Sequence, residues 1–251
     1  MKIIAVIQAR MESTRLPGKV LKPVAGEPML KRIVERVSQS RCLDSVIVAT
    51  SCNSADNAIE EFCRQEGILC FRGSQDNVLE RYYQCSSRYQ GEIIIRLTAD
   101  NVFVDPDIIM DAVQCFRING RMDYLYYREG LPLGMAVEVF TMEALRKAYQ
   151  EAEDAECKEH VTLYMYRNPG SFHCVREKGS EDYSFLRLTM DTAKDYQMIE
   201  ELYTCLLHKG MAVSYGNVVK ELLHNEKLRS INEGIVQKIP VYGLGDKEAL
   251  L

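Results

Sequence analysis

Short runs of apolar residues alternate with amphipathic segments along the first half of the chain. The first run, residues 3–7, is β-branched and predicts a strand buried on both faces. Further runs of this kind are residues 46–49, 68–71 and 92–97. Between the runs, apolar residues recur at helical spacing, as from Met29 to Val37, and Asp105-Pro106 is a typical helix start. The alternation predicts an α/β fold with a mostly parallel sheet covered by helices on both faces.

The second half of the chain has a less regular pattern. Strands are expected at residues 123–127, 135–140 and 185–190, and helices at residues 141–153, 159–168 and 193–208. From residue 226 onward the periodicity is weak. Because neither a repeat nor a clear linker interrupts the sequence, we expect a single domain over residues 1–251, with room for a small inserted lobe at about residues 128–184.

Composition narrows the class of protein. With 251 residues, 47% of them hydrophobic and 27% charged, the chain has the profile of a soluble globular protein. Its net charge of −5 argues against a nucleic-acid partner, because no basic excess is present to neutralise a phosphate backbone. The first apolar run is too short for a signal peptide or a membrane span, and nine scattered cysteines without a CxxC pair are typical of a reducing compartment. We therefore expect a cytoplasmic protein with no membrane partner.

A polar and basic segment, residues 8–19, follows the first predicted strand. It carries three cations with small polar residues between them, namely Arg10, Ser13, Arg15, Gly18 and Lys19. Guanidinium groups, a compact ammonium and loop N–H groups together suit the oxygens of a polyphosphate. The alternative is a solvated surface loop, although the segment lies at a strand end, where parallel sheets bind ligands. The GxxxxGK[ST] motif of P-loop ATPases is absent, which disfavours that class.

The order of residues in this segment is more specific than its charge. The stretch ARMESTRLPGK, followed by GEPML, resembles the opening of the cytidylyltransferases that make CMP-activated acidic sugars. These include the CMP-Kdo and the CMP-sialic acid (acylneuraminate) synthetases, and the similarity is strongest to their SpsF-like branch. The resemblance implies the Rossmann-like fold of nucleotide-diphospho-sugar transferases (GT-A type), with CTP as the nucleotide.

In that family the opening loop wraps the triphosphate. The resemblance implies that Arg10, Arg15 and Lys19 neutralise phosphates and are the catalytic cations. It also implies that the Ala9 backbone lies against the nucleoside and that Gly18 allows the turn, since glycine tolerates φ > 0. The nucleotide-binding residues implied for this loop are Ala9, Arg10, Ser13, Arg15, Gly18 and Lys19.

Two aspartates, each just past a predicted strand, are candidates for a magnesium site. Asp100 belongs to RLTADN and Asp191 to LTMDTAKDY, and both stretches resemble segments that carry the metal ligands of the family. The resemblance therefore implies that both bind Mg²⁺, an ion that takes a few carboxylates together with water and phosphate oxygens. Considered by itself, either side chain could instead cap a turn or a helix. Asp105 and Asp195 are better explained as helix-start carboxylates.

Other segments resemble the base and sugar pockets of the family. FRGSQDNVLER implies Arg72 and Ser74 as base contacts, with Asp76 explained as a helix cap. The candidates for acceptor binding are Arg96, Glu138, His160 and Arg187. His160 is equally well explained as a capping or core histidine. Relatives usually read RLTGDCPLIDP where this chain reads RLTADNVFVDP, so residues 101–103 depart from the pattern beside the predicted metal ligand.

Together these features predict a cytidylyltransferase that transfers CMP from CTP to an acidic sugar or sugar-like acceptor and releases pyrophosphate, in surface polysaccharide or glycoconjugate synthesis. A GT-A glycosyltransferase, a catalytically silent nucleotide-binding regulatory protein, and an enzyme for a phosphorylated alditol or phosphonate remain as alternatives. The arginine-rich loop argues against the glycosyltransferase, because a triphosphate needs more cations than a sugar diphosphate. Members of the family are frequently homodimers, and no stretch of the sequence marks an interface.

Overall fold

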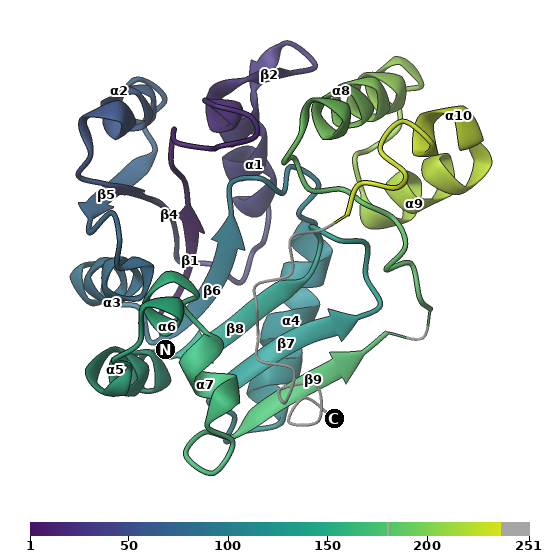
Figure 1. Cartoon of the computed structure of the whole chain (residues 1–251). Coiled ribbons are helices and arrows are strands. Elements are labelled where there is room, and N and C mark those ends of the chain that lie inside the picture. Colours follow the sequence, from purple (N-terminus) through teal and green to yellow (C-terminus); the bar gives the residue numbers. More distant parts are fainter. Residues whose placement is uncertain (180, 237–251) are drawn as a thin grey trace.

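A seven-stranded sheet forms the centre of the protein in the computed structural model, which describes residues 1–179 and 181–236 (Figure 1). Its strand order is β5-β4-β1-β6-β8-β7-β9. The strands are β1 (Ile3–Gln8), β4 (Ser45–Ser51), β5 (Leu69–Gly73), β6 (Ile93–Thr98), β7 (Tyr124–Glu129), β8 (Val137–Thr141) and β9 (Cys174–Lys178). In this sheet only the two pairs that involve β8 are antiparallel, so β8 runs in the opposite direction to the other six strands. The predicted α/β fold with a mostly parallel sheet is confirmed.

Helices cover both faces of this sheet, as predicted. The longer ones are α1 (Met29–Val37), α2 (Asn57–Gln65), α3 (Val78–Arg88), α4 (Pro106–Ile118), α5 (Met142–Glu151), α8 (Ala193–His208) and α9 (Tyr215–His224). Alternate residues of β1 belong to different cores, because side chains of a strand point to opposite faces. Ile3 and Ile7 pack with α1, α4 and α8, whereas Ile4 and Val6 pack with α3 and α5. The β1 strand is therefore buried on both sides.

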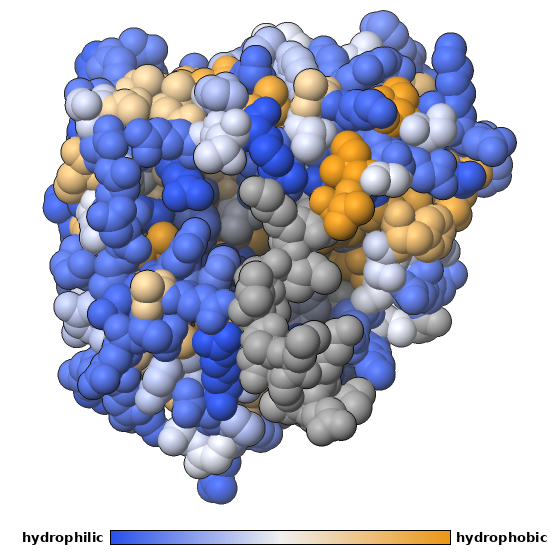
Figure 2. All heavy atoms as spheres, in the orientation of Figure 1, coloured by the Kyte–Doolittle hydropathy of each residue, from blue (hydrophilic) through white to orange (hydrophobic). Residues whose placement is uncertain are grey.

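Shorter elements complete the fold. They are the 3-10 helices η1 (Lys19–Leu21) and η2 (Ser54–Asp56), the hairpin strands β2 (Pro23–Val24) and β3 (Glu27–Pro28), and the helices α6 (Ala155–Glu159), α7 (Leu163–Arg167) and α10 (Glu226–Arg229). None of the helices in the described part of the chain is long and apolar enough to cross a bilayer. The surface on the face drawn in Figure 2 is mainly hydrophilic, with an apolar group beside α9 and α10.

Two elements expected from the sequence are wrong in detail. The helix expected at residues 159–168 is two short helices, because the backbone at His160 leaves the helical region (φ −105°, ψ 89°) and ends α6. Residues 185–190 do not join the sheet, and Phe185 lies in a turn closed by a bond from Leu186 N to Tyr183 O. The stretch pairs instead with a loop, through a bond from Leu133 N to Leu186 O of 2.9 Å and one from Leu188 N to Leu133 O of 2.8 Å. The edge strand β9 was not predicted.

The division of the chain into one domain with an inserted lobe remains a prediction. Within residues 128–184, β8 and β9 both pair with β7, so this stretch contributes to the central sheet. The weakly periodic tail begins with α10, and its part from residue 237 onward lies outside the described residues.

Candidate functional site

Three segments that are distant in the sequence meet at the carboxyl ends of the central strands. Strands β1 and β6 are parallel neighbours with Gln8 opposite Thr98, so the chain leaves both strands at the same rim. Ala99 N donates to Gln8 O at 2.9 Å just beyond the pairing. The third segment is joined by a bond of 2.8 Å from Met190 N to the carbonyl oxygen of Asp100. This rim is where open parallel sheets bind their ligands.

The loop after β1 is folded back on itself by a left-handed glycine. Gly18 has φ 67°, which glycine adopts without strain, and its N–H donates to Met11 O at 3.0 Å. Met11 N in turn donates to a carboxylate oxygen of the buried Asp56 at 2.7 Å. These bonds hold the loop against the rim and place Lys19 at the first turn of η1. The turn role predicted for Gly18 is confirmed.

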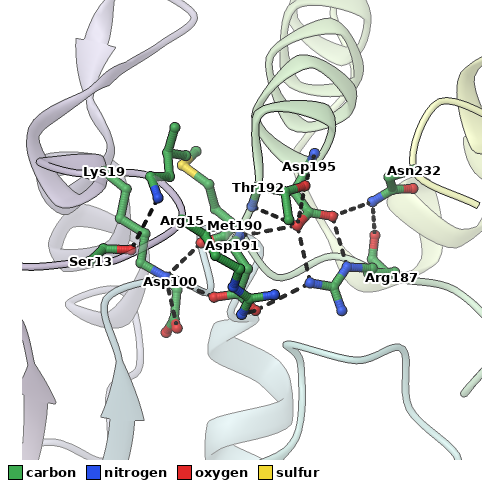
Figure 3. A network of polar contacts seen from close by, with 11 residues as sticks. Ser13, Arg15, Lys19, Asp100, Arg187, Met190, Asp191, Thr192, Asp195 and Asn232 are labelled. Carbon is green, nitrogen blue, oxygen red and sulfur yellow. Dashed lines mark hydrogen bonds and ion pairs between the residues drawn. The ribbon is translucent and has the colours of Figure 1, made fainter. Parts of the chain in front are cut away.

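Lys19 lies between the two predicted metal ligands (Figure 3). Its Nζ is 3.2 Å from Asp100 Oδ2, 2.9 Å from Asp191 Oδ1 and 2.7 Å from the carbonyl oxygen of Met190. Burial by itself raises the pKa of Asp100, but the Lys19 charge and a hydrogen bond from Thr98 outweigh it and lower that pKa. Asp100 is therefore held as a carboxylate at neutral pH. The structure brings together the cation and both carboxylates that the sequence singled out.

Asp191 is surrounded by three cations. While Oδ1 faces Lys19, Oδ2 lies 3.2 Å from Arg15 and 3.2 Å from Arg187. Arg15 is the more exposed of these two guanidinium groups, and Arg187 is buried. The Asp191 carboxylate thus connects the opening loop to the segment before α8, and Arg15 remains close enough to the rim to meet a ligand.

Arg187 is bound mainly to Asp195. Its Nε and NH2 donate to the two carboxylate oxygens at 2.8 and 3.0 Å. Asp195 also closes a capping box with Thr192 at the start of α8, so the predicted helix-start role of Asp195 is confirmed. Asn232 completes the group by donating to Asp195 Oδ1 at 2.9 Å and to Arg187 O at 3.1 Å. With its charge neutralised here, Arg187 is placed to orient Asp191.

Sequence reasoning missed Asn232. A lone asparagine in a weakly periodic stretch carries no motif or spacing that marks a contact 37 positions away, where Asp195 lies. Asp105 behaves as predicted, because its carboxylate accepts from Asp107 N and Ile108 N at the start of α4.

The donor set at the rim fits a magnesium ion. Both carboxylates have an oxygen within 3.2 Å of the same Lys19 nitrogen, so they face a common position. Among residues 1–179 and 181–236, no group of three or more His, Cys, Asp and Glu side chains is arranged to hold a metal. Two carboxylates with the remaining positions left to water and phosphate oxygens is the arrangement Mg²⁺ prefers in nucleotide sites. Asp100 and Asp191 are the residues that would hold it.

The other residues predicted for nucleotide binding lie in different surroundings. Ala9 is buried and donates its N–H to Ala49 O at 3.1 Å, whereas Arg10 is exposed. Ser13 Oγ accepts from Leu16 N at 3.4 Å, a bond within the loop itself. Arg10 is therefore available to a ligand from solvent, and Ser13 contributes to the shape of the loop.

Arg72 lies on β5 and Ser74 directly follows this strand, and both side chains form hydrogen bonds with neighbouring segments. The Arg72 guanidinium donates to Ser51 O at 3.0 Å and to Asn53 O at 2.7 Å, and it pairs with Glu60. Ser74 Oγ accepts from Asn77 N at 3.1 Å. These bonds direct the Arg72 guanidinium toward η2 and α2. The helix cap of α3 is Asn77, whose side chain accepts from Glu80 N, so the cap expected at Asp76 is wrong.

Arg96 and Glu138 form an ion pair across neighbouring strands, where they are register partners on β6 and β8. Glu138 also accepts from Tyr124 OH at 2.7 Å and from Thr162 Oγ1 at 2.7 Å. Burial raises the pKa of Glu138 by itself, but the Arg96 charge and these donors outweigh it and lower that pKa. His160 is the C-cap residue of α6, and its carbonyl oxygen accepts from Leu163 N at 2.8 Å; the role of its side chain stays a prediction.

A parallel sheet with a cationic loop and two converging carboxylates at its carboxyl rim defines a nucleotide-binding α/β protein. The model of the cytidylyltransferase family matches residues 4–235. The spore coat polysaccharide biosynthesis protein SpsF of Bacillus subtilis is 38% identical over 208 residues, 80% of this chain and 86% of that protein. The 3-deoxy-manno-octulosonate cytidylyltransferase of Parabacteroides distasonis is 36% identical over 226 residues, 88% of this chain and 78% of that protein.

A solved structure shows the same likeness. A cytidylyltransferase from Leptospira borgpetersenii superposes with a TM-score of 0.85 at 30% identity and covers 95% of this chain and 100% of that one. The chain belongs to the cytidylyltransferase family and is a nucleotidyltransferase.

Proposed function

We propose that this nucleotidyltransferase uses Mg²⁺ to transfer CMP from CTP to an acidic sugar or sugar-like acceptor, with release of pyrophosphate, for surface polysaccharide or glycoconjugate synthesis. The observation that carries the proposal is the position of Lys19 between Asp100 and Asp191 at the sheet rim. The names of two relatives, a spore coat polysaccharide biosynthesis protein and a 3-deoxy-manno-octulosonate cytidylyltransferase, support the acceptor class and the pathway.

The reaction is an in-line displacement at the α-phosphorus of CTP. A bond forms from an acceptor oxygen to phosphorus, the bond to the bridging oxygen of pyrophosphate breaks, and the acceptor proton passes to solvent. In this proposal Arg10, Arg15 and Lys19 neutralise the charge that grows on pyrophosphate. Asp100 and Asp191 would hold the magnesium ion, which would supply further neutralisation of the phosphate charge. Positioning provides much of the rest of the acceleration.

The ion pairs of Lys19 fit this role. Its ammonium reduces the repulsion between two carboxylates that face each other across the rim. A divalent ion held by these carboxylates would take over that role, and the Lys19 ammonium would then be free to pair with phosphate oxygens.

A screen for pyrophosphate release tests the proposal. It crosses ATP, GTP, CTP and UTP with 3-deoxy-manno-octulosonate, N-acetylneuraminate, hexose 1-phosphates and alditol phosphates, with and without Mg²⁺. Release with CTP and an acidic sugar, lost when EDTA removes the metal, is the expected result. Release with only the alditol phosphates would show that the acceptor is a phosphorylated alditol and not an acidic sugar. CTP binding without turnover across the whole panel would favour a silent regulatory protein and overturn the enzymatic role.

A further inference from the structure

A narrow pocket of about 60 Å³ lies beside the carboxyl end of β6. Arg96, Thr98, Asn101, Gly134 and Glu138 are among the residues that line it. It adjoins the charged group at the rim, because Asn101, which lines it, follows Asp100 directly in the chain. We call it the Asn101 pocket.

The Asn101 side chain has a fixed orientation in this pocket. Its Nδ2 donates to Thr98 Oγ1 at 2.8 Å, which fixes the amide in this orientation. The other amide atom, Oδ1, is buried and has no hydrogen-bond partner among the described residues. Gly134 stands opposite it, since a Cβ on this glycine would lie 2.9 Å from Asn101 Oδ1. The pocket thus presents a buried acceptor that lacks a donor.

The second polar wall of the pocket is a charge-neutral pair. The positive charge of Arg96 is balanced by Glu138, whose oxygens are occupied by Arg96, Tyr124 and Thr162. Arg96 Nε is also buried without a partner among the described residues, so it is a donor that lacks an acceptor. A carboxylate or phosphate would meet no net positive charge here, and it would approach the lone pairs of Asn101 Oδ1. A hydroxyl group offers both a donor and an acceptor without charge.

We propose that the Asn101 pocket receives a hydroxyl group of the acceptor, and that Asn101 Oδ1 accepts its hydrogen bond and so determines acceptor specificity. The inference rests on the proposed function, because it concerns the second substrate of the same reaction. Glu138 is in this view a positioning residue for Arg96.

The expected effect follows from the cost of an unpaired buried group. A site built to hydrogen-bond a hydroxyl discriminates strongly, because its own polar atoms are left unsatisfied when the partner is absent. Asn101→Ala and the similarly sized Asn101→Leu both remove the acceptor atom, and Leu fills most of the volume. We expect both variants to raise the KM for the acceptor by about 10- to 100-fold, with the KM for CTP unchanged within about twofold.

Pyrophosphate release with 3-deoxy-manno-octulosonate and with N-acetylneuraminate is the test, with Asn119→Ala as the matched control. Asn119 is exposed at the end of α4, where its side chain bonds Cys115 of its own helix and no other residue in the described part of the chain. An unchanged acceptor KM in Asn101→Leu would overturn the inference and leave the proposed function intact. An equal rise in the KM for CTP would also overturn it, because Asn101 would then serve the nucleotide.

If the wild-type chain releases no pyrophosphate with any acid of the panel, the proposed function fails, and the pocket is tested separately. The side-chain amide signal of Asn101 in a ¹⁵N-labelled sample, assigned by its loss in Asn101→Leu, is followed during titration with glycerol. A saturable shift of this signal, with the Asn119 signal unmoved, supports a hydroxyl-binding pocket. A signal that does not move, or moves in step with Asn119, overturns it.

Discussion

Asp191 lies 2.9 Å from the Lys19 ammonium, although 172 positions separate the two residues in the chain. The contact exists because β1 and β6 end at one rim and Met190 N is bonded to the carbonyl of Asp100 beside them. The cationic loop after β1 and the Asp191 carboxylate therefore meet at the same place on the sheet rim.

Replacing either carboxylate should stop turnover and spare the fold. We expect Asp100→Asn and Asp191→Asn each to lower kcat by about 100-fold or more, because each removes a charged contact worth roughly 3 kcal/mol of barrier. The measurement is pyrophosphate release from CTP over a range of Mg²⁺ concentrations, with circular dichroism as the check on folding. Asp107→Asn, the same change at an exposed position of α4, is the control. Wild-type rates in both variants would remove the metal assignment.

Lys19 should be indispensable for a different reason. Lys19→Met deletes the cation that pairs with both carboxylates, so we expect kcat/KM for CTP to fall about 100-fold or more. Lys19→Arg should recover little of this, because the planar guanidinium cannot replace a compact ammonium that contacts three oxygens.

Lys22→Met is the matched control for Lys19→Met. Lys22 lies three positions further along, with its Nζ 5.5 Å from the centre of the Tyr196 ring. A loss of activity in Lys22→Met as large as in Lys19→Met would point to general damage of the loop. Steady-state kinetics with CTP as the varied substrate separates the two outcomes.

Much of the fold can be predicted from residue pattern because three central strands of the sheet are mostly apolar runs. Burial on both faces leaves β1, β4 and β6 with little choice of residue. The edge strand β9 has the opposite character. Its residues, CVREK, are half-buried or exposed and mostly polar, so nothing in the pattern separates it from a loop. Its pairing with β7 depends on tertiary packing and not on its own sequence pattern.

The site divides in the same way. Arg15, Lys19 and Asp100 stand beside strand ends that the pattern predicts, and the family resemblance added Asp191. The local sequence does not show when the hydrogen-bonding capacity of a side chain is filled by residues that are distant in the chain. The substrate contact of Glu138 stays a prediction, and the structure adds three partners, Arg96, Tyr124 and Thr162, from which its carboxylate accepts. Hydrogen-bond partners of this kind depend on how β7, β8 and α7 pack, which a single sequence does not state.

Asn232 should matter for stability more than for chemistry. Its Nδ2 is buried and donates to Asp195 and to the carbonyl of Arg187. Asn232→Ala leaves those acceptors short of a donor, so we expect the free energy of unfolding to fall by about 1–3 kcal/mol. Urea denaturation followed by circular dichroism measures the change, with Asn217→Ala, at the start of α9, as a comparison. A midpoint shift no larger than that of Asn217→Ala would show that the contact adds nothing.

Lowering the pH should reduce the contribution of the Asp195 carboxylate to the free energy of unfolding over a defined range. Burial alone raises the pKa of Asp195, but Arg187, Asn232 and Thr192 outweigh it and lower that pKa below its ordinary value. A carboxyl whose pKa is lower in the folded state adds stability above its unfolded pKa, about 3.9 for aspartate, and loses it as pH falls through the folded value. Unfolding free energy should therefore decline below about pH 4 and be flat with respect to Asp195 near neutrality.

The variant that isolates this effect is Asp195→Asn. At pH 7 it removes one partner of the buried pair with Arg187, so we expect a loss of about 3–5 kcal/mol. The difference from wild type should shrink as the pH falls below about 4, because the wild-type carboxyl is then being protonated as well. Glu138, whose pKa is also lowered, titrates in the same acid range, so Glu138→Gln serves as the parallel variant. A gap between wild type and Asp195→Asn that is constant from pH 7 to pH 3 would mean that the ion pair with Arg187 does not stabilise the fold.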